Sequence, residues 1–163
     1  MKRVCWLLKS ITKLDNRALV LHVFVAAAAS ISLTHLVAII DSFFEQSGRP
    51  SLEAMGDLSF FLLAVIFSPV VETLLFQMLP VSICLQRHRS AVEAFLWSSI
   101  PFALMHSAHG LGIFIGVGVV CGVIFGLSAV LWAKRSLAAS FWVVCSVHAL
   151  HNFYFYAGDR LLP

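Results

Sequence analysis

Four polar side chains with the chemistry needed to activate water interrupt the long apolar stretches of this sequence. Glu72 has no Lys or Arg nearby in the sequence, although burying an ionisable group in an apolar span costs about 2.5 to 3.5 kcal/mol. His106 ends a second stretch, and His148 and Asn152 lie four residues apart in a third, which places them on one helix face. Carboxylates and imidazoles can accept protons, and an amide can stabilise an oxyanion. We therefore predict that Glu72, His106, His148 and Asn152 are catalytic.

The spacing of the histidines also leaves a metal-binding alternative open. His109 follows His106 at i+3, and His151 follows His148 at the same spacing, which suits metal ligands on a helix. Together with Glu72, these pairs could serve a metal-binding or transport bundle. We assign no metal and no cofactor from the sequence, and metal analysis of the pure protein would separate the two alternatives.

The remaining ionisable and small residues have structural explanations. His22 and His35 fall on different faces of one stretch, so we expect local packing or interhelical hydrogen bonds. Glu93 lies near Arg87 and Arg89, which indicates an interfacial ion pair. Single cysteines without metal or disulfide spacing are expected to be small core residues: Cys5, Cys84, Cys121 and Cys145. Small-x-x-x-small spacing predicts close helix packing at Gly112, Gly116, Gly118, Gly122 and Gly126.

The elements that position these residues must be membrane helices. Of the 163 residues, 60% are hydrophobic and 12% are charged, and the mean hydropathy is +0.94. The apolar stretches are continuous rather than alternating, which excludes barrel strands. Only helices or closed barrels satisfy their backbone polar groups inside a bilayer. The sequence therefore predicts an all-α, multi-pass transmembrane helical bundle of about five spans.

The predicted spans are separated by short polar or basic segments, with one longer loop at 41–57. We place the spans at residues 18–40, 58–85, 90–106, 110–132 and 137–156. They form one domain, the bundle at 18–156, followed by a short tail at 157–163. Residues 1–17 alternate basic and apolar side chains, so they form either an amphipathic helix at the interface or a solvated basic tail.

Basic residues lie at the ends of the spans, where they report topology rather than nucleic-acid binding. With the N-terminus inside, nine of the 11 Lys and Arg residues fall on the cytoplasmic side, in the tail and after the second and fourth spans. Only Arg49 and Arg160 fall on the other side. We predict a multi-pass protein of the cell (inner) membrane with a cytoplasmic N-terminus, and no nucleic-acid partner.

A proline disturbs the helix beside the predicted base. Pro69 lies three residues before Glu72, and a proline inside a helix removes one backbone hydrogen bond and displaces the carbonyl four residues earlier. Here that carbonyl belongs to Val65. We expect the helix to be loosened next to the carboxylate.

Three short segments resemble the CPBP family, the CAAX protease and bacteriocin-processing (Abi) intramembrane endopeptidases. That family carries Glu-Glu-x-x-x-Arg, Phe-x-x-x-His and His-x-x-x-Asn on successive spans. The present chain has Glu72–Gln77 (ETLLFQ), Phe102–His106 (FALMH) and His148–Asn152 (HALHN) in the same order. The resemblance covers residues 58–156 as the core, and it identifies the chain as similar to the intramembrane glutamic endopeptidases.

The resemblance implies that Glu72 and His106 activate a water for attack on a peptide carbonyl, while His148 and Asn152 stabilise the oxyanion. It implies a membrane-associated peptide or protein as substrate, such as a bacteriocin, a leader peptide or a sorting tail. Thr73 and a glutamine at 77 stand where the family has its second glutamate and its arginine. A non-catalytic bacteriocin immunity or membrane binding protein of the same fold is the alternative, and loss of effect in Glu72→Gln would discriminate against it.

Overall fold

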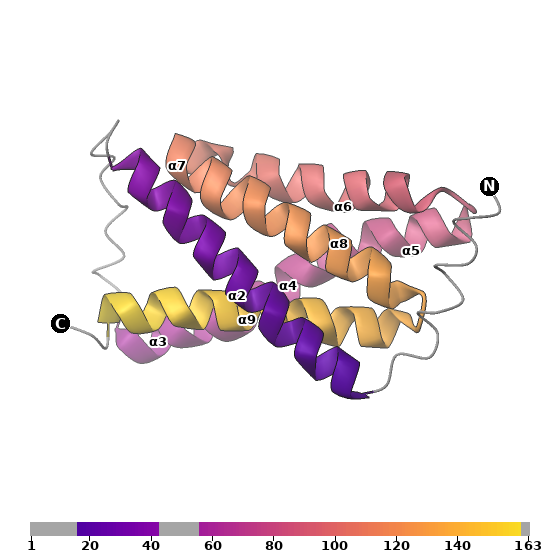
Figure 1. Cartoon of the computed structure of the whole chain (residues 1–163), viewed down its shortest axis with the longest axis horizontal. Coiled ribbons are helices and arrows are strands. Elements are labelled where there is room, and N and C mark those ends of the chain that lie inside the picture. The colour runs from indigo at the N-terminus through magenta and orange to yellow at the C-terminus, as the bar shows by residue number, and fades with distance from the viewer. Residues whose placement is uncertain (1–15, 43–55, 161–163) are drawn as a thin grey trace.

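The computed structural model describes residues 16–42 and 56–160, which form an all-helical bundle of five rods. Figure 1 shows that successive rods run in opposite directions. The first rod is α2 (Asn16–Asp41). The second joins α3 (Asp57–Phe61), η2 (Leu62–Phe67), α4 (Ser68–Glu72), η3 (Thr73–Met78) and α5 (Leu79–Gln86). The third rod is α6 (Ala91–Met105), followed by the short η4 (Ser107–His109). The fourth joins α7 (Leu111–Ile113), η5 (Phe114–Cys121) and α8 (Gly122–Ala133). The fifth is α9 (Leu137–Arg160).

The rods confirm the predicted all-α bundle and match the five predicted spans closely. Three of them, Asn16–Asp41, Asp57–Gln86 and Leu111–Ala133, are long and apolar enough to cross a membrane by length and composition. Helix α6 has 15 residues and α9 has 24. The predicted basic segment at 1–17 and most of the loop at 41–57 lie outside the described residues.

The bundle is apolar outside and partly polar inside, the reverse of a water-soluble protein. Large apolar side chains expose more than half of their surface on several rods, among them Leu21, Phe24, Leu58, Trp97 and Trp142. The buried polar residues are Ser30, Thr34, Thr73, Gln77, Ser98, Ser99, Ser128, Ser140, His148 and His151. Soluble monomers rarely expose so much contiguous apolar surface, whereas lipid tails solvate it.

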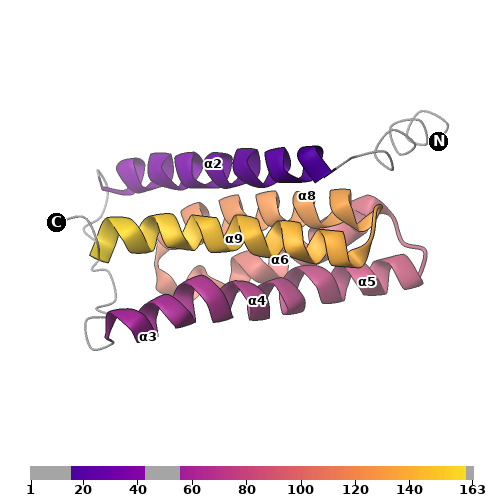
Figure 2. The same cartoon turned by 90° about the horizontal axis from the view of Figure 1, so that it is seen from below.

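The rods pack around α8 and α9. Helix α2 crosses over α9 and η5, while the rod from α3 to α5 lies on the opposite side of the bundle (Figure 2). Phe102 of α6, Phe125 of α8 and Val147 of α9 are fully buried at the centre. Burying such side chains contributes about 1.5 to 3 kcal/mol each in water, although dispersion contacts replace the hydrophobic term within a bilayer.

Glycines allow α6 and the rod of η5 and α8 to approach closely, as the sequence predicted. A Cβ atom at Gly118 would lie 2.9 Å from the Ala103 carbonyl oxygen, and one at Gly122 would lie 3.0 Å from that of Ser99. Gly116 faces α2 instead, where a Cβ atom would meet Val37 at 3.4 Å. The glycines therefore serve two different helix interfaces.

The three cysteines within the described residues, Cys84, Cys121 and Cys145, are free and buried, in line with the prediction.

The second rod contains two wide π-helical turns, and a proline follows each. Pro69 comes two residues after η2 ends, and Pro80 comes two residues after η3 ends. A proline lacks the N–H that an α-helix would use and crowds the turn before it, and a wide turn accommodates both effects. At the end of η2, the Ser68 N–H bonds to the carbonyl of Leu63, five residues earlier. The predicted loosening beside Glu72 therefore takes the form of π turns on both sides of α4.

Charged residues divide between the two ends of the bundle. The start of α2, the α5–α6 turn and the α8–α9 turn lie at one end (Figure 1), which carries Arg17, Arg87, Arg89, Lys134 and Arg135. The other end carries Asp41, Asp57, Asp159 and Arg160. The topology prediction depends on the Lys and Arg residues alone, and the cytoplasmic location of the basic end stays a prediction.

Candidate active site

Glu72 lies at mid-length of the second rod, where α4 meets η3. Its side chain is 19% exposed and faces α9 rather than lipid. The Ser68 hydroxyl donates a hydrogen bond to Oε1 of the carboxylate from one turn earlier on the same helix. Oε2 has no hydrogen-bond partner among the described residues. One carboxylate oxygen is therefore held in place, and the other is free to accept a proton or a hydrogen bond.

His148 faces this free oxygen from the middle of α9. Its Nε2 atom lies 3.9 Å from Oε2 of Glu72. The imidazole is buried, with its ring centroid 4.7 Å from that of Phe125 and 5.9 Å from that of Phe102. A separation of 3.9 Å is too long for a direct hydrogen bond, but a water oxygen can lie about 2.8 Å from both atoms.

His106 stands at the carboxyl end of α6, where its ring contacts that of Phe102. Its Nδ1 atom lies 2.9 Å from the Phe102 carbonyl oxygen, and its ring centroid lies 4.7 Å from that of Phe102. A carbonyl oxygen can only accept, so Nδ1 must carry the proton of a neutral ring, and Nε2 is left as an acceptor.

Asn152 lies one turn after His148 on the same face of α9, and its amide contacts the second rod. Its Nδ2 atom donates to the Ala64 carbonyl oxygen at 2.8 Å. That carbonyl lacks a helical donor, because the Ser68 N–H bonds to Leu63 and Pro69 has no N–H. Asn152 therefore satisfies a backbone group that the proline leaves free, close to the predicted base.

The structure thus brings Glu72 and His148 face to face and places Asn152 beside them on the same two rods. His106 comes from the third rod, and its link to the other three residues is the Phe102 ring, which contacts the imidazoles of both His106 and His148. A carboxylate and two imidazoles in a protein interior are groups that can serve general-base hydrolysis.

A protein-family model, described as "Type II CAAX prenyl endopeptidase Rce1-like", matches residues 54–154, which is more than half of the chain. The chain belongs to the type II CAAX prenyl endopeptidase Rce1-like family. No curated protein matches the chain, and no solved structure matches it. The match confirms the resemblance drawn from the three motifs and covers nearly the same residues as the core predicted at 58–156. Membership in the Rce1-like family supports a membrane peptidase in general.

Two residues of the Rce1-like chain that depart from the CPBP motif are fully buried beside Glu72. Thr73 and Gln77 are 0% exposed, and neither the Thr73 hydroxyl nor either amide atom of Gln77 has a hydrogen-bond partner among the described residues. Sequence reasoning missed Ser68, the hydrogen-bond donor to Glu72. Its i, i+4 spacing from Glu72 is the signal that could have identified it.

His151 belongs to a different cluster from His148, although the two are three residues apart. Its Nδ1 atom lies 3.1 Å from the Ser30 hydroxyl, and its Nε2 atom lies 3.6 Å from Sγ of Cys121. These contacts join α9 to α2 and η5, whereas His148 faces Glu72 on the second rod. Within the described residues, no group of three or more His, Cys, Asp or Glu side chains is arranged to hold a metal ion.

His22, His35 and Glu93 make the interhelical hydrogen bonds and the ion pair expected of them. His22 Nε2 lies 2.9 Å from the Ser128 hydroxyl, and His35 Nε2 lies 3.1 Å from the Tyr154 hydroxyl, so each links two helices. Glu93 lies 3.4 Å from Arg89, as predicted for an interfacial ion pair.

Proposed function

We propose that this Rce1-like chain is an intramembrane peptidase in which Glu72 and the neighbouring imidazoles activate a water. The observation that carries the proposal is the 3.9 Å separation between Oε2 of Glu72 and Nε2 of His148 inside the bundle. A water held by these two atoms lies next to a carboxylate oxygen that has no other partner. The Ser68 hydroxyl orients the carboxylate through its hydrogen bond to the other oxygen, Oε1.

The proposed reaction is hydrolysis of one peptide bond. Glu72 takes a proton from the water as its oxygen attacks the scissile carbonyl carbon, and the carbonyl oxygen becomes an oxyanion. The acceptor Nε2 of His106 assists the deprotonation, and the imidazole of His148 donates a hydrogen bond to the oxyanion. The second Nδ2 proton of Asn152 is available for the same oxyanion. Glu72 then returns its proton to the leaving nitrogen as the C–N bond breaks, which yields a carboxylate and an amine.

The substrate we propose is a membrane-associated peptide or protein whose cleavage site reaches mid-membrane depth. Glu72 and His148 lie halfway along their rods, so the peptide must enter between helices of the bundle. A processed bacteriocin, a leader peptide or a sorting tail has this character, and the name of the family points to C-terminal CAAX sequences. The protein acts from the inner membrane with its N-terminus in the cytoplasm.

The test compares cells that express wild-type protein, Glu72→Gln or Thr73→Val at matched levels. Mass spectrometry of the membrane proteome identifies the peptide that the wild type alone shortens, and cleavage of that peptide is then timed with purified protein. Removal of a general base costs about 100-fold to 10,000-fold in rate. The Thr73 hydroxyl has no hydrogen-bond partner among the described residues, so Thr73→Val should keep cleavage within roughly tenfold of the wild-type rate, the most that one hydrogen bond to the water or the substrate would contribute. Wild-type cleavage by purified Glu72→Gln would reject the proposal, and a non-catalytic immunity protein would then be the better account.

A further inference from the structure

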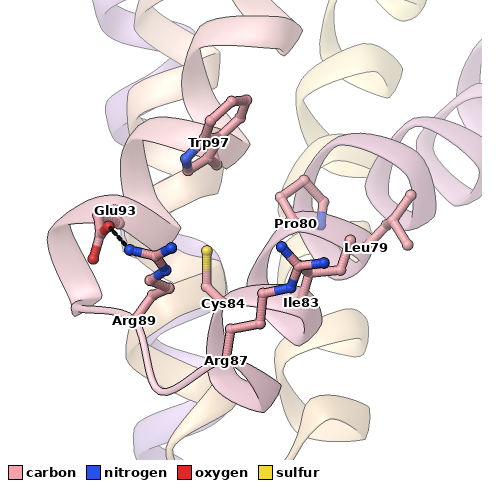
Figure 3. A pocket seen from close by; sticks show the side chains of 8 residues that line it. All are labelled: Leu79, Pro80, Ile83, Cys84, Arg87, Arg89, Glu93 and Trp97. Atoms are coloured by element: carbon pink, nitrogen blue, oxygen red, sulfur yellow. Dashed lines mark hydrogen bonds and ion pairs between the residues drawn. The ribbon is translucent and has the colours of Figure 1, made fainter.

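A groove separate from the candidate active site opens between α5 and α6 at the basic end of the bundle. Its volume is about 580 Å³. Figure 3 shows that the guanidinium groups of Arg87 and Arg89 lie on either side of the Cys84 thiol, with the Trp97 ring farther along α6. None of the four predicted catalytic residues lines it. The groove is therefore basic at its mouth and apolar along its length.

The turn between the two helices fixes the arginines in this position. The Arg89 N–H donates to the Cys84 carbonyl oxygen at 2.8 Å, and the His88 N–H donates to that of Leu85 at 3.1 Å. These two bonds form a Schellman motif, with His88 in the left-handed region at φ 51°. Because both bonds hold the backbone, the side chains of Arg87 and Arg89 extend from a turn of defined conformation.

The charges at the mouth of the groove do not balance. Glu93 pairs with Arg89 at 3.4 Å, and the Ser90 backbone N–H and hydroxyl hold the same carboxylate at 2.8 and 2.9 Å in a capping box. Arg87 makes no ion pair with any residue that the structure describes. Two guanidiniums therefore face one carboxylate, which leaves one uncompensated positive charge beside an apolar surface.

The apolar part of the groove runs along the helices toward the membrane centre. Trp97 lies six residues after the start of α6, and Pro80 lies seven residues before Arg87, so these side chains are about 9 to 10 Å deeper than the arginines. Ile83 and Trp97 are exposed on the two walls. A ligand that fits must carry a negative head and an apolar tail of at least this length.

We propose that this groove binds one anionic phospholipid, with the phosphate between Arg87 and Arg89 and one acyl chain along Ile83 and Trp97. Arginine forks match phosphate oxygens, and the anionic cytoplasmic leaflet adjoins the end of the bundle that carries this groove in the predicted topology. The proposal depends on the charge and shape of the groove and stands whether or not the chain is a peptidase.

The test uses Trp97 as a fluorescent reporter in reconstituted full-length protein. The reporter protein carries Trp6→Phe and Trp142→Phe, so that Trp97 and the buried Trp132 are its remaining tryptophans. It is reconstituted into vesicles that contain either brominated phosphatidylglycerol or brominated phosphatidylcholine, and quenching of tryptophan fluorescence by the brominated lipid measures binding. One uncompensated charge near a membrane surface should favour the anionic lipid about fivefold in relative association constant. Equal quenching by the two lipids would overturn the proposal.

Three variants in this background make the test specific to the groove. Arg87→Gln should bring the preference down to about one, whereas Glu93→Gln keeps the capping box and should raise the preference about fivefold again. Arg135→Gln removes a positive charge at the same end of the bundle but outside the groove, and should leave the preference unchanged. Equal losses in Arg87→Gln and Arg135→Gln, or displacement of the lipid by millimolar inorganic phosphate, would overturn the proposal. Circular dichroism checks that each variant stays helical.

Discussion

Replacing Asn152 with Ala should destabilise the bundle through a backbone group on another helix. Asn152 supplies the Ala64 carbonyl with the donor that Pro69 cannot provide. An unsatisfied buried carbonyl costs about 1 to 3 kcal/mol in general, while interhelical hydrogen bonds in a membrane protein average about 0.6 kcal/mol. Ala64 is only half-buried, so we expect the lower part of this range, a loss of about 1 kcal/mol in the free energy of unfolding.

The matched control is Pro69→Ala, which returns a backbone N–H to position 69. In that background the helix can satisfy the Ala64 carbonyl by itself, so Asn152→Ala should cost almost nothing. The double-mutant cycle should then give a coupling energy of at least about 0.5 kcal/mol between Pro69 and Asn152. A purely packing role for Asn152 predicts no such coupling.

Unfolding is measured by titration with denaturing detergent in mixed micelles, followed by circular dichroism. Equal destabilisation by Asn152→Ala in the wild-type and Pro69→Ala backgrounds would refute the reasoning. The same four proteins also separate stability from catalysis. If Asn152 donates to the oxyanion as proposed, cleavage falls in both backgrounds, even where the free energy of unfolding is restored.

Three further outcomes follow from the geometry. Ser68→Ala removes the hydrogen bond to Glu72, and a hydrogen bond to a charged acceptor is worth about 1.5 to 3 kcal/mol. Turnover in a timed cleavage assay should therefore fall at least tenfold, and Ser68→Thr, which keeps the hydroxyl, should recover it. Gly122→Ala places a Cβ atom 3.0 Å from the Ser99 carbonyl oxygen and should lower the free energy of unfolding by about 1 to 3 kcal/mol. Gly56→Ala, with nothing within 4 Å of the added Cβ atom, meets no clash and should lower that free energy by less than Gly122→Ala in the same titration, through the poorer N-cap of α3 alone. Reporter fusions after Arg89 should report cytoplasm and fusions after Arg160 the opposite side; the reverse pattern would contradict the orientation.

The sequence by itself determined the helices and the family. An apolar stretch in a bilayer must satisfy its backbone hydrogen bonds locally, so the length of each stretch predicts its helix almost independently of the others. This is why the predicted span at 58–85 corresponds so closely to the rod Asp57–Gln86. The three motifs around Glu72, His106 and His148 likewise indicated the family, because residue types and spacing along one chain are local information.

Only the tertiary structure decided which polar groups meet. His148 faces Glu72 while His151 turns to Ser30 and Cys121, although the sequence gives both histidines similar surroundings. Partners of this kind depend on how far each helix is rotated about its axis. The π turns next to Pro69 and Pro80 change that rotation, so a regular period of 3.6 residues does not predict which face of the second rod meets α9. The hydrogen bond from Asn152 to Ala64 follows from the same local widening, because the carbonyl that it satisfies is free only where the helix departs from regular geometry.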